Sequence, residues 1–241
     1  TWRDIPAVPI NAFKELTLSC VSPEQAERVF MTSGTTKGVR GKHYHSTLRV
    51  YDQSMIVNFQ KRFMKEHNKI KMGILFPTED ELPNSSLAHY LALAVNVFGT
   101  EDSRYLVDRD GLHIDRILAE LEQAEQSGEP YALLGASFSF VHLFEELVKR
   151  GKTFRLPEGS RILDTGGFKS QSREMDLDEF YDTLSAFLGV PRRECINMYG
   201  MTELSTQFYD DGNEAVPSVK SGPHWIRTRV VHPLTGEEMP K

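Results

Sequence analysis

The sequence contains 241 residues, with 28 Lys and Arg against 34 Asp and Glu, so its formal net charge is −6. Hydrophobic residues make up 39% and charged residues 26%, a composition that is typical of globular proteins and excludes collagens, coiled coils and disordered chains. The mildly acidic balance also argues against nucleic acid or an anionic membrane surface as the main partner.

Segments of strand length alternate with segments of helix length along the chain. In order, the pattern predicts a helix start at residues 22–25, a strand at 28–32, a helix that begins after Ser46, a strand at 71–76, a helix at 86–98, a strand at 104–108, a helix at 113–126, a strand at 131–134, a helix at 138–149, a strand at 161–164, a helix at 176–188 and a strand at 195–198. Such repeated units predict the α/β class, with a mainly parallel sheet flanked by helices on both faces.

Local signals support several of these elements. Ser22 can cap a helix, Pro23 suits the first helical position, and Gln25 can complete a capping box. Ser46 can cap the following helix, whose apolar residues recur at steps of three and four and therefore lie on one face. Those apolar residues are Leu48, Tyr51, Met55, Phe59 and Phe63.

The last part of the chain has a different pattern. Residues 225–232 alternate with period two and residues 233–236 have the composition of a turn, so we expect a small antiparallel appendage there. We therefore expect an α/β core over residues 1–216 and the start of a β subdomain over 217–241. Because the chain begins at Thr1 rather than Met and stops in a turn-like phrase at Lys241, we also expect a fragment in which the β subdomain is truncated.

The cysteine content, the N-terminal segment and the longest uncharged stretch indicate the cellular compartment. Cys20 and Cys195 are too few for a disulfide framework and have no CxxC spacing, which fits a reducing compartment. The N-terminus has no apolar signal core, and the uncharged stretch at 85–100 is shorter than the roughly 20 apolar residues of a membrane span. The sequence therefore predicts a cytoplasmic protein without a membrane span.

Small and polar residues gather in four segments at predicted strand ends: 33–41, 135–137, 165–169 and 199–203. Ligands of doubly wound sheets bind beyond the carboxyl ends of the strands. The first segment is rich in glycines, hydroxyls and cations, the groups that surround a polyphosphate. It reads Thr32-Ser33-Gly34-Thr35-Thr36-Lys37-Gly38-Val39-Arg40-Gly41-Lys42. It matches neither a Walker A loop nor GxGxxG, and a flexible hairpin loop is the alternative interpretation.

This loop resembles the Ser/Thr-Gly-Thr-Thr-Gly phosphate loop of the adenylate-forming superfamily, with Lys37 where the family has Gly. Residues 199–203 are similar to that family's Tyr-Gly-x-Thr-Glu motif, and residues 165–169 resemble its Gly-Gly turn at the adenine pocket. Residues 221–223, 229–231 and 234–240 resemble its downstream stretch. Residues 83–86, 166–169 and 197–203 are most similar to the LuxE-type acyl-protein synthetase branch.

The resemblance implies the core of the N-terminal domain of an AMP-forming ligase. Such an enzyme would use ATP and Mg²⁺ to activate a carboxylic acid, here a fatty acid, as an acyl-adenylate for transfer to a protein thiol. A carboxylic acid is ionised at neutral pH, so its attack on phosphorus needs no general base. The family's ribose-binding Asp, hinge, C-terminal lid and acceptor Cys would then lie beyond Lys241, and Cys20 and Cys195 are expected to be packed apolar residues.

The resemblance also implies a role for each residue of the motifs. The phosphates of ATP would contact Ser33, Gly34, Thr35, Thr36, Lys37 and Gly38. The adenine slot and its surroundings would comprise Gly166, Gly167, Phe168, Tyr199, Gly200 and Met201. Catalytic roles would fall to Thr202 at the α-phosphate, to Glu203 as the Mg²⁺ ligand, and to Lys42, with Lys37 and Arg40 as alternative sources of charge. The acyl group would contact Ser137, Phe138 and His89.

Simpler structural roles compete with several of these assignments. Residues 135–139 half-resemble a nucleophile elbow, but Ser137 is better explained as a helix cap. His43 and His45 could bind a metal from one side of a strand, yet no third ligand is near in the sequence. His89 could be a core histidine, and the acidic run at 79–81 is most simply a solvated loop.

Three functions remain as alternatives to the acyl-protein synthetase. One is a ligase that transfers the acyl group to coenzyme A, and the second is a nucleotide-binding module without catalysis. The third is an α/β serine hydrolase built on Ser137.

Overall fold

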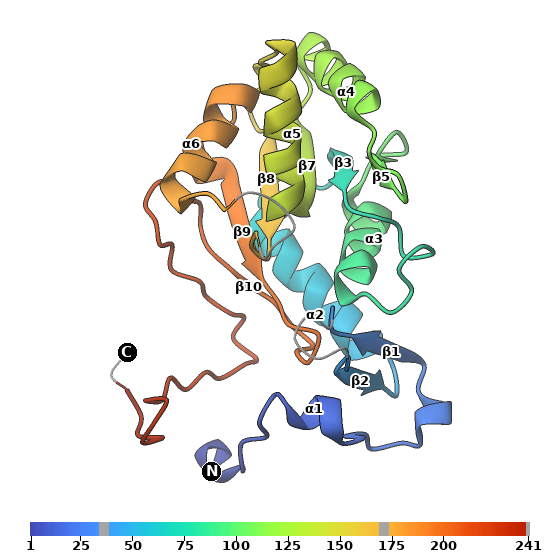
Figure 1. The fold of residues 1–241 in the computed structure, drawn as a ribbon, viewed down its shortest axis with the longest axis vertical. Coiled ribbons are helices and arrows are strands. Elements are labelled where there is room, and N and C mark those ends of the chain that lie inside the picture. Colours follow the sequence, from blue (N-terminus) through green and yellow to red (C-terminus); the bar gives the residue numbers. More distant parts are fainter. Residues whose placement is uncertain (34–38, 169–173, 240–241) are drawn as a thin grey trace.

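The computed structural model describes residues 1–33, 39–168 and 174–239. In this part of the chain the central sheet is six-stranded, in the order β10-β9-β8-β7-β3-β4 (Figure 1). β4, β3, β7, β8 and β9 are parallel, and β10 is antiparallel to β9 at one edge. The strands are β3 Lys71–Leu75, β4 Arg104–Tyr105, β7 Tyr131–Ala136, β8 Arg161–Thr165, β9 Cys195–Tyr199 and β10 Phe208–Tyr209.

Helices cover both faces of the sheet, as the alternating pattern predicts. The principal helices are α2 Arg49–Phe59, α3 Ser86–Phe98, α4 Ile114–Ser127, α5 Ser137–Arg150 and α6 Leu177–Leu188. Shorter elements are α1 Ala12–Glu15, the 3₁₀ turns Trp2–Asp4, Pro23–Gln25 and Arg192–Glu194, and a π-helical turn at Gln60–Met64. Among the described residues, no helix is both long enough and apolar enough to cross a membrane.

The core is divided into two apolar clusters by the sheet. Leu133 and Ile162 point to the face covered by α4, α5 and α6. Leu134 and Leu163, the next residues on the same strands, point to the face covered by α2 and α3. Successive side chains of a strand alternate between faces, so strands buried on both sides have continuous apolar sequences.

Most predicted elements are confirmed, and α3 has the predicted limits of 86–98. The five apolar residues predicted for one face of the second helix are all buried. The predicted start of that helix after Ser46 is wrong, because α2 begins at Arg49. The backbone N–H of Leu48, before the first turn, donates to Glu27 Oε2 at 3.1 Å, so the preceding segment supplies an acceptor that Ser46 was expected to provide.

Three short segments near the N-terminus and in the middle differ from prediction. Residues 22–25 form a single 3₁₀ turn rather than a longer helix, and Ser22 makes no side-chain cap hydrogen bond. β1 Arg28–Met31 lies outside the central sheet and pairs antiparallel with β2 Lys42–His45. The predicted strand at 104–108 divides into β4 and β5 Val107–Asp108, because β5 pairs with β6 Gly111–Leu112 instead of continuing along β3.

The predicted strand at 225–232 is also wrong. The described residues show a single antiparallel bridge there, between Val231 and Glu238. Val230 is 65% exposed and Val231 is 38% exposed, so these two side chains bury little of the apolar surface that stabilises a strand. The turn at 233–236 does form, and the N–H of Gly236 donates to the carbonyl of His232 at 2.9 Å.

Candidate active site at the carboxyl ends of the parallel strands

The carboxyl ends of the central strands open onto a cavity of about 290 Å³. The strands point toward the part of the molecule that contains β1 and β2 (Figure 1). Of the predicted site residues that the structure describes, seven line this cavity: Ser33, Phe138, Gly166, Gly167, Gly200, Met201 and Thr202. The segments that follow β7, β8 and β9 therefore converge, as parallel neighbouring strands require.

The base of the glycine-rich loop lies beside Glu203. Thr32 and Gly41 close the loop, since the N–H of Thr32 donates to the Gly41 carbonyl at 3.0 Å and the N–H of Gly41 donates to Thr32 Oγ1 at 2.9 Å. A Cβ built on Gly41 would lie 3.4 Å from Glu203 Oε1. The predicted phosphate-loop residues Gly34, Thr35, Thr36, Lys37 and Gly38 lie outside the described residues. Tertiary structure thus brings the end of this loop and the Glu203 carboxylate together.

The segment that contains Thr202 and Glu203 is anchored by β2. His43 Nδ1 donates to the Thr202 carbonyl at 3.0 Å, which assigns the proton to this nitrogen. The His43 ring stacks on the His45 ring, with 4.4 Å between the ring centroids. Burial, with smaller contributions from His43 and His89, lowers the pKa of His45 to about 4. A metal site at these histidines is not supported, because the described residues contain no group of three His, Cys, Asp or Glu side chains that could hold a metal ion.

The turn formed by Gly166 and Gly167 after β8 leaves open space above its backbone. Gly166 has φ of 82°, a left-handed conformation that favours glycine. A Cβ built on either residue would meet no atom of the described residues within 4 Å, apart from its own chain neighbours. The turn therefore presents bare backbone to the cavity, where a flat group could approach closely.

A second cavity, of about 190 Å³, lies behind this glycine turn and contains Asp164. The buried carboxylate accepts hydrogen bonds from Ser137 Oγ at 2.8 Å, Asn197 Nδ2 at 2.8 Å and the Tyr181 hydroxyl at 3.0 Å. Burial raises the pKa of Asp164 to about 6, and the three hydrogen bonds oppose that effect. Asp164 thereby joins α5, α6 and β9 behind the site.

The expectation that Ser137 caps a helix is wrong. Ser137 is the first residue of α5, whose N-cap position is Ala136, and no side-chain cap hydrogen bond forms there. The Ser137 hydroxyl lies within hydrogen-bond distance of Asp164 and of the Thr165 carbonyl. Neither partner is an imidazole that could activate a serine nucleophile, so this geometry does not favour the hydrolase interpretation.

Other predicted residues lie around the first cavity rather than in its lining. Lys42 is exposed at the start of β2. The Phe168 ring packs against the Phe180 ring, with 5.6 Å between the ring centroids, and Phe168 lines the second cavity. Tyr199 is 47% exposed, and its ring centroid lies 6.2 Å from that of Phe208. An exposed aromatic face at this position is accessible to a planar ligand.

His89 is buried between two carboxylates. Its Nδ1 lies 2.8 Å from Glu79 Oε1, and its Nε2 lies 2.8 Å from Asp52 Oδ1. Glu79 also pairs with Arg28 at 2.9 Å. The interpretation of residues 79–81 as a solvated loop is therefore wrong for Glu79.

For α3, sequence reasoning assigned His89 to the site and missed the residues that line the cavity. The α3 residues Ser86, Leu87 and Tyr90 line the cavity, as does Tyr51 of α2, whereas the predicted His89 is not in the lining. The Tyr90 hydroxyl lies 2.9 Å from that of Tyr209. The helical period of three and four places residues 86, 87 and 90 on one face, but the sequence did not indicate that this face meets the strand ends.

Comparison with known proteins gives matches over nearly the whole chain. The family model of the acyl-protein synthetase LuxE matches residues 2–241. A relative from Vibrio harveyi is 25% identical over 243 residues, covering 99% of this chain and 62% of the relative. One from Aliivibrio fischeri is 25% identical over 240 residues, covering 98% of this chain and 61% of the relative. Both are named long-chain-fatty-acid–luciferin-component ligase, and the chain spans about three fifths of their length.

Solved structures share the fold at low sequence identity. ATP-bound MatB from Rhodopseudomonas palustris has a TM-score of 0.59 at 17% identity, over 92% of this chain and 38% of MatB. The long-chain-fatty-acid-CoA ligase FadD1 from Archaeoglobus fulgidus has a TM-score of 0.54 at 15% identity, over 91% of this chain and 41% of that protein. Because the family model covers almost every residue, the chain belongs to the LuxE family of acyl-protein synthetases.

Proposed function

We propose that this chain forms the ATP- and acid-binding core of a ligase that activates a fatty acid as an acyl-adenylate and transfers it to a protein thiol. The observation that carries the proposal is the proximity of two distant motifs: Glu203 Oε1 would lie 3.4 Å from a Cβ built on Gly41, where the glycine-rich loop closes. Thr202 and the glycine turn line the adjoining cavity. A triphosphate, a metal ion and an acid could therefore meet at this place.

The first step joins the acid to ATP. A carboxylate oxygen attacks the α-phosphorus, a C–O–P linkage forms, and the bond from that phosphorus to its bridging oxygen breaks, so pyrophosphate leaves with the bonding electrons. The difficulty of this step is electrostatic, since one anion approaches another, and the protein must supply positioning and positive charge. Thr202 would bind the α-phosphate, and Lys42 would supply charge from the edge of the loop.

The site fits one Mg²⁺ ion held mainly by phosphate oxygens. Mg²⁺ is commonly bound through one or two carboxylates, substrate phosphates and water, and Glu203 offers a carboxylate next to the loop. When bound, Mg²⁺ supplies positive charge that stabilises the departing pyrophosphate.

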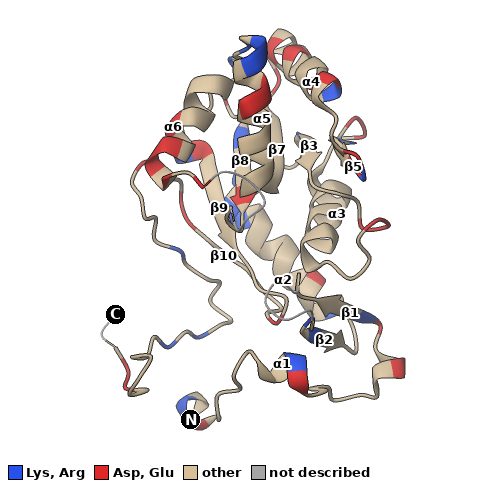
Figure 2. Cartoon of the chain, viewed as in Figure 1, with Lys and Arg blue, Asp and Glu red and all other residues tan. Residues whose placement is uncertain are grey.

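Part of the cavity wall suits an apolar acid. Phe76, Leu87 and Phe138 contribute to the cavity lining. α3, which forms part of this wall, carries no Lys, Arg, Asp or Glu (Figure 2). The names of both relatives include a long-chain fatty acid, and this supports a fatty acid as the substrate here.

The second step requires a thiolate acceptor. A sulfur attacks the acyl carbonyl, a thioester forms, AMP leaves, and the thiol proton passes to solvent. Burial raises the pKa of the Cys195 thiol well above its usual range, so this side chain is a poor nucleophile. Cys20 is exposed, contrary to the expectation that both cysteines are packed. We propose that the acceptor is a cysteine of another protein in the cytoplasm.

Trapping the activated acid tests the proposal. The protein is incubated with ATP, Mg²⁺, hydroxylamine and a saturated fatty acid, and both pyrophosphate and acyl hydroxamate are measured. We expect both products to depend on the acid and on ATP. Nucleotide binding without either product would instead support the binding module. Replacing hydroxylamine by coenzyme A or by a candidate acceptor protein then separates the two ligase alternatives.

A further inference from the structure

A further cavity, of about 430 Å³, runs along the outer side of α5. We call it the α5 groove. Phe138, His142 and Glu145 of α5 form one wall, and Val107, Leu112 and Ile114 form the apolar part of the other. These three apolar side chains are partly buried against the core cluster on this face of the sheet. The lining of the groove therefore combines four apolar side chains with the charged side chains of Glu145, Glu146 and Lys149 on α5.

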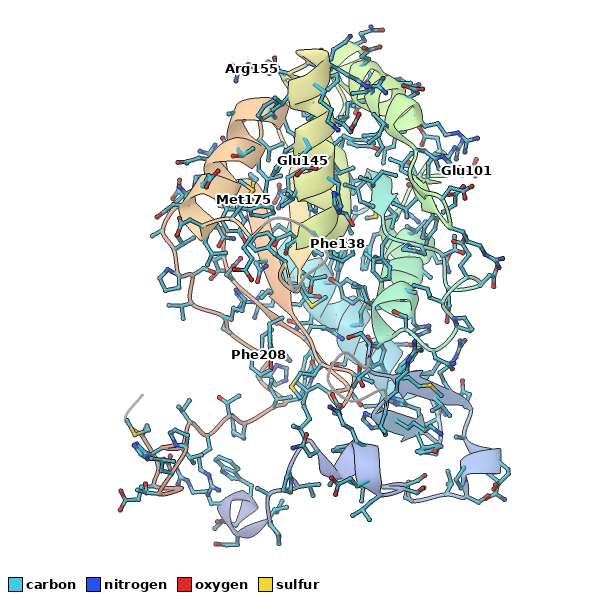
Figure 3. The ribbon with its side chains drawn as sticks, viewed as in Figure 1. Glu101, Phe138, Glu145, Arg155, Met175 and Phe208 are labelled. Atoms are coloured by element: carbon cyan, nitrogen blue, oxygen red, sulfur yellow. The ribbon has the colours of Figure 1, made fainter. Side chains whose placement is uncertain are left out.

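Phe138 connects the groove to the candidate active site. Among the described residues, it is the only one in the linings of both cavities. Its ring is half-buried and lies 6.5 Å from the His142 ring in an edge-on arrangement. Figure 3 shows Phe138 at the lower end of α5 and Glu145 farther up the same helix. One aromatic side chain thus separates the strand-end cavity from a second apolar space.

We propose that the alkyl end of a long-chain fatty acid passes Phe138 and lies in the α5 groove, so that Phe138 controls the chain length that the protein accepts. This inference rests on the proposed function, which places the carboxyl group of the acid in the strand-end cavity. The alkyl chain is the occupant that matches the arrangement, because it is apolar, it is flexible and its head is held in the adjoining cavity. Binding of the alkyl chain would remove water from the apolar side chains of Val107, Leu112 and Ile114.

The charged residues of α5 limit the useful length of the groove. Glu145 lies seven residues after Phe138, which is about 10 Å along a helix axis. A chain that extends past this point would remove water from the exposed Glu145 carboxylate without offering it a partner. Binding should therefore improve with each added CH₂ up to that point and then level off.

The test measures binding and turnover over a series of saturated acids from hexanoate to hexadecanoate. Binding is followed by displacement of a fluorescent fatty acid, and turnover by hydroxamate formation. In the unmodified protein, affinity should rise about fourfold for each CH₂ that is buried, until the plateau. Phe138→Trp should narrow the passage and weaken hexadecanoate binding at least tenfold more than it weakens hexanoate binding.

Two further variants distinguish an effect on the passage of the alkyl chain from a nonspecific effect on folding or binding. Leu112→Glu places a charge in the groove without touching Phe138, and it should also weaken binding of long acids selectively. Val148→Trp enlarges a 64% exposed position of α5 outside the groove lining, and its chain-length profile should match that of the unmodified protein. Unfolding curves of each variant verify that the fold is retained.

The possible results distinguish this inference from the function on which it depends. If Phe138→Trp and Leu112→Glu change the binding of hexanoate and hexadecanoate equally, or not at all, the alkyl chain lies elsewhere while the ligase function stands. If no acid displaces the probe or supports hydroxamate formation in the unmodified protein, both the function and the inference are overturned.

Discussion

Replacing Asp164 by Asn removes a buried charge behind the glycine turn while preserving side-chain size. Burial raises the pKa of Asp164 to about 6 from an ordinary value of 3.8. The folded protein therefore binds this proton more tightly than the unfolded chain does. The resulting stabilisation is fully present below the unfolded pKa and is lost as the pH rises through about 6.

The magnitude follows from these two pKa values. A single group with this shift lowers the free energy of unfolding by about 2 kcal/mol between about pH 4.5 and about pH 7.5. An Asn side chain can keep the local hydrogen bonds, because its amide oxygen can accept from Ser137 and Asn197 while its NH₂ group donates to the Tyr181 hydroxyl. Asp164→Asn should therefore remove the pH-dependent contribution without a large loss of packing.

Urea unfolding of both proteins at the two pH values measures this contribution. The free-energy difference between wild type and Asp164→Asn should fall by about 2 kcal/mol over that pH range, since the other carboxyl groups are common to both proteins and cancel. Asp182→Asn, at a 69% exposed side chain, is the matched control and should show a much smaller change. A difference that does not vary with pH would refute the reasoning about burial.

Gly73→Ala should lower the free energy of unfolding by about 1–3 kcal/mol, because its Cβ would lie too close to the buried Tyr131 hydroxyl, and Tyr131→Phe should recover part of that loss in urea unfolding. If Tyr131→Phe gives no recovery, the close approach is not the cause. Gly166→Ala should cost about 1–2 kcal/mol because of its left-handed φ of 82°, and it should also weaken ATP binding in a titration; normal stability would contradict the first part. Glu203→Gln should reduce hydroxamate formation by about 100-fold or more at an unchanged unfolding midpoint, whereas unchanged turnover would remove Glu203 from the proposed metal site.

Helices and buried strands were predictable because their signals are local. The apolar steps of α2 and the uninterrupted uncharged run of α3 reflect which side chains each helix buries. Gly151 and Gly189 adopt the left-handed conformation at the ends of α5 and α6, where a residue without Cβ is favoured. Alternating strands and helices of this kind predict the α/β class before any contact is known.

Strand partners were less predictable because pairing depends on neighbours that are distant in the sequence. β1 resembles the central strands in composition, yet it pairs with β2 in a separate sheet. The segment at 225–232 has the alternation of a strand, but an isolated bridge at Val231 is the only pairing that the described residues show there. Period-two alternation predicts that a segment can form a strand. Whether it pairs, and with which strand, depends on the surrounding structure.

The sequence by itself determined the α/β class, the order of the principal elements and the motifs that identify the family. It did not determine which of those side chains meet. The approach of Glu203 to Gly41, the hydrogen bond from His43 to Thr202, the burial of Asp164 against Ser137 and the contribution of Tyr90 to the cavity all join residues from different elements. Such contacts follow from how strands are ordered and helices are packed across the sheet, and local periodicity carries no information about that order.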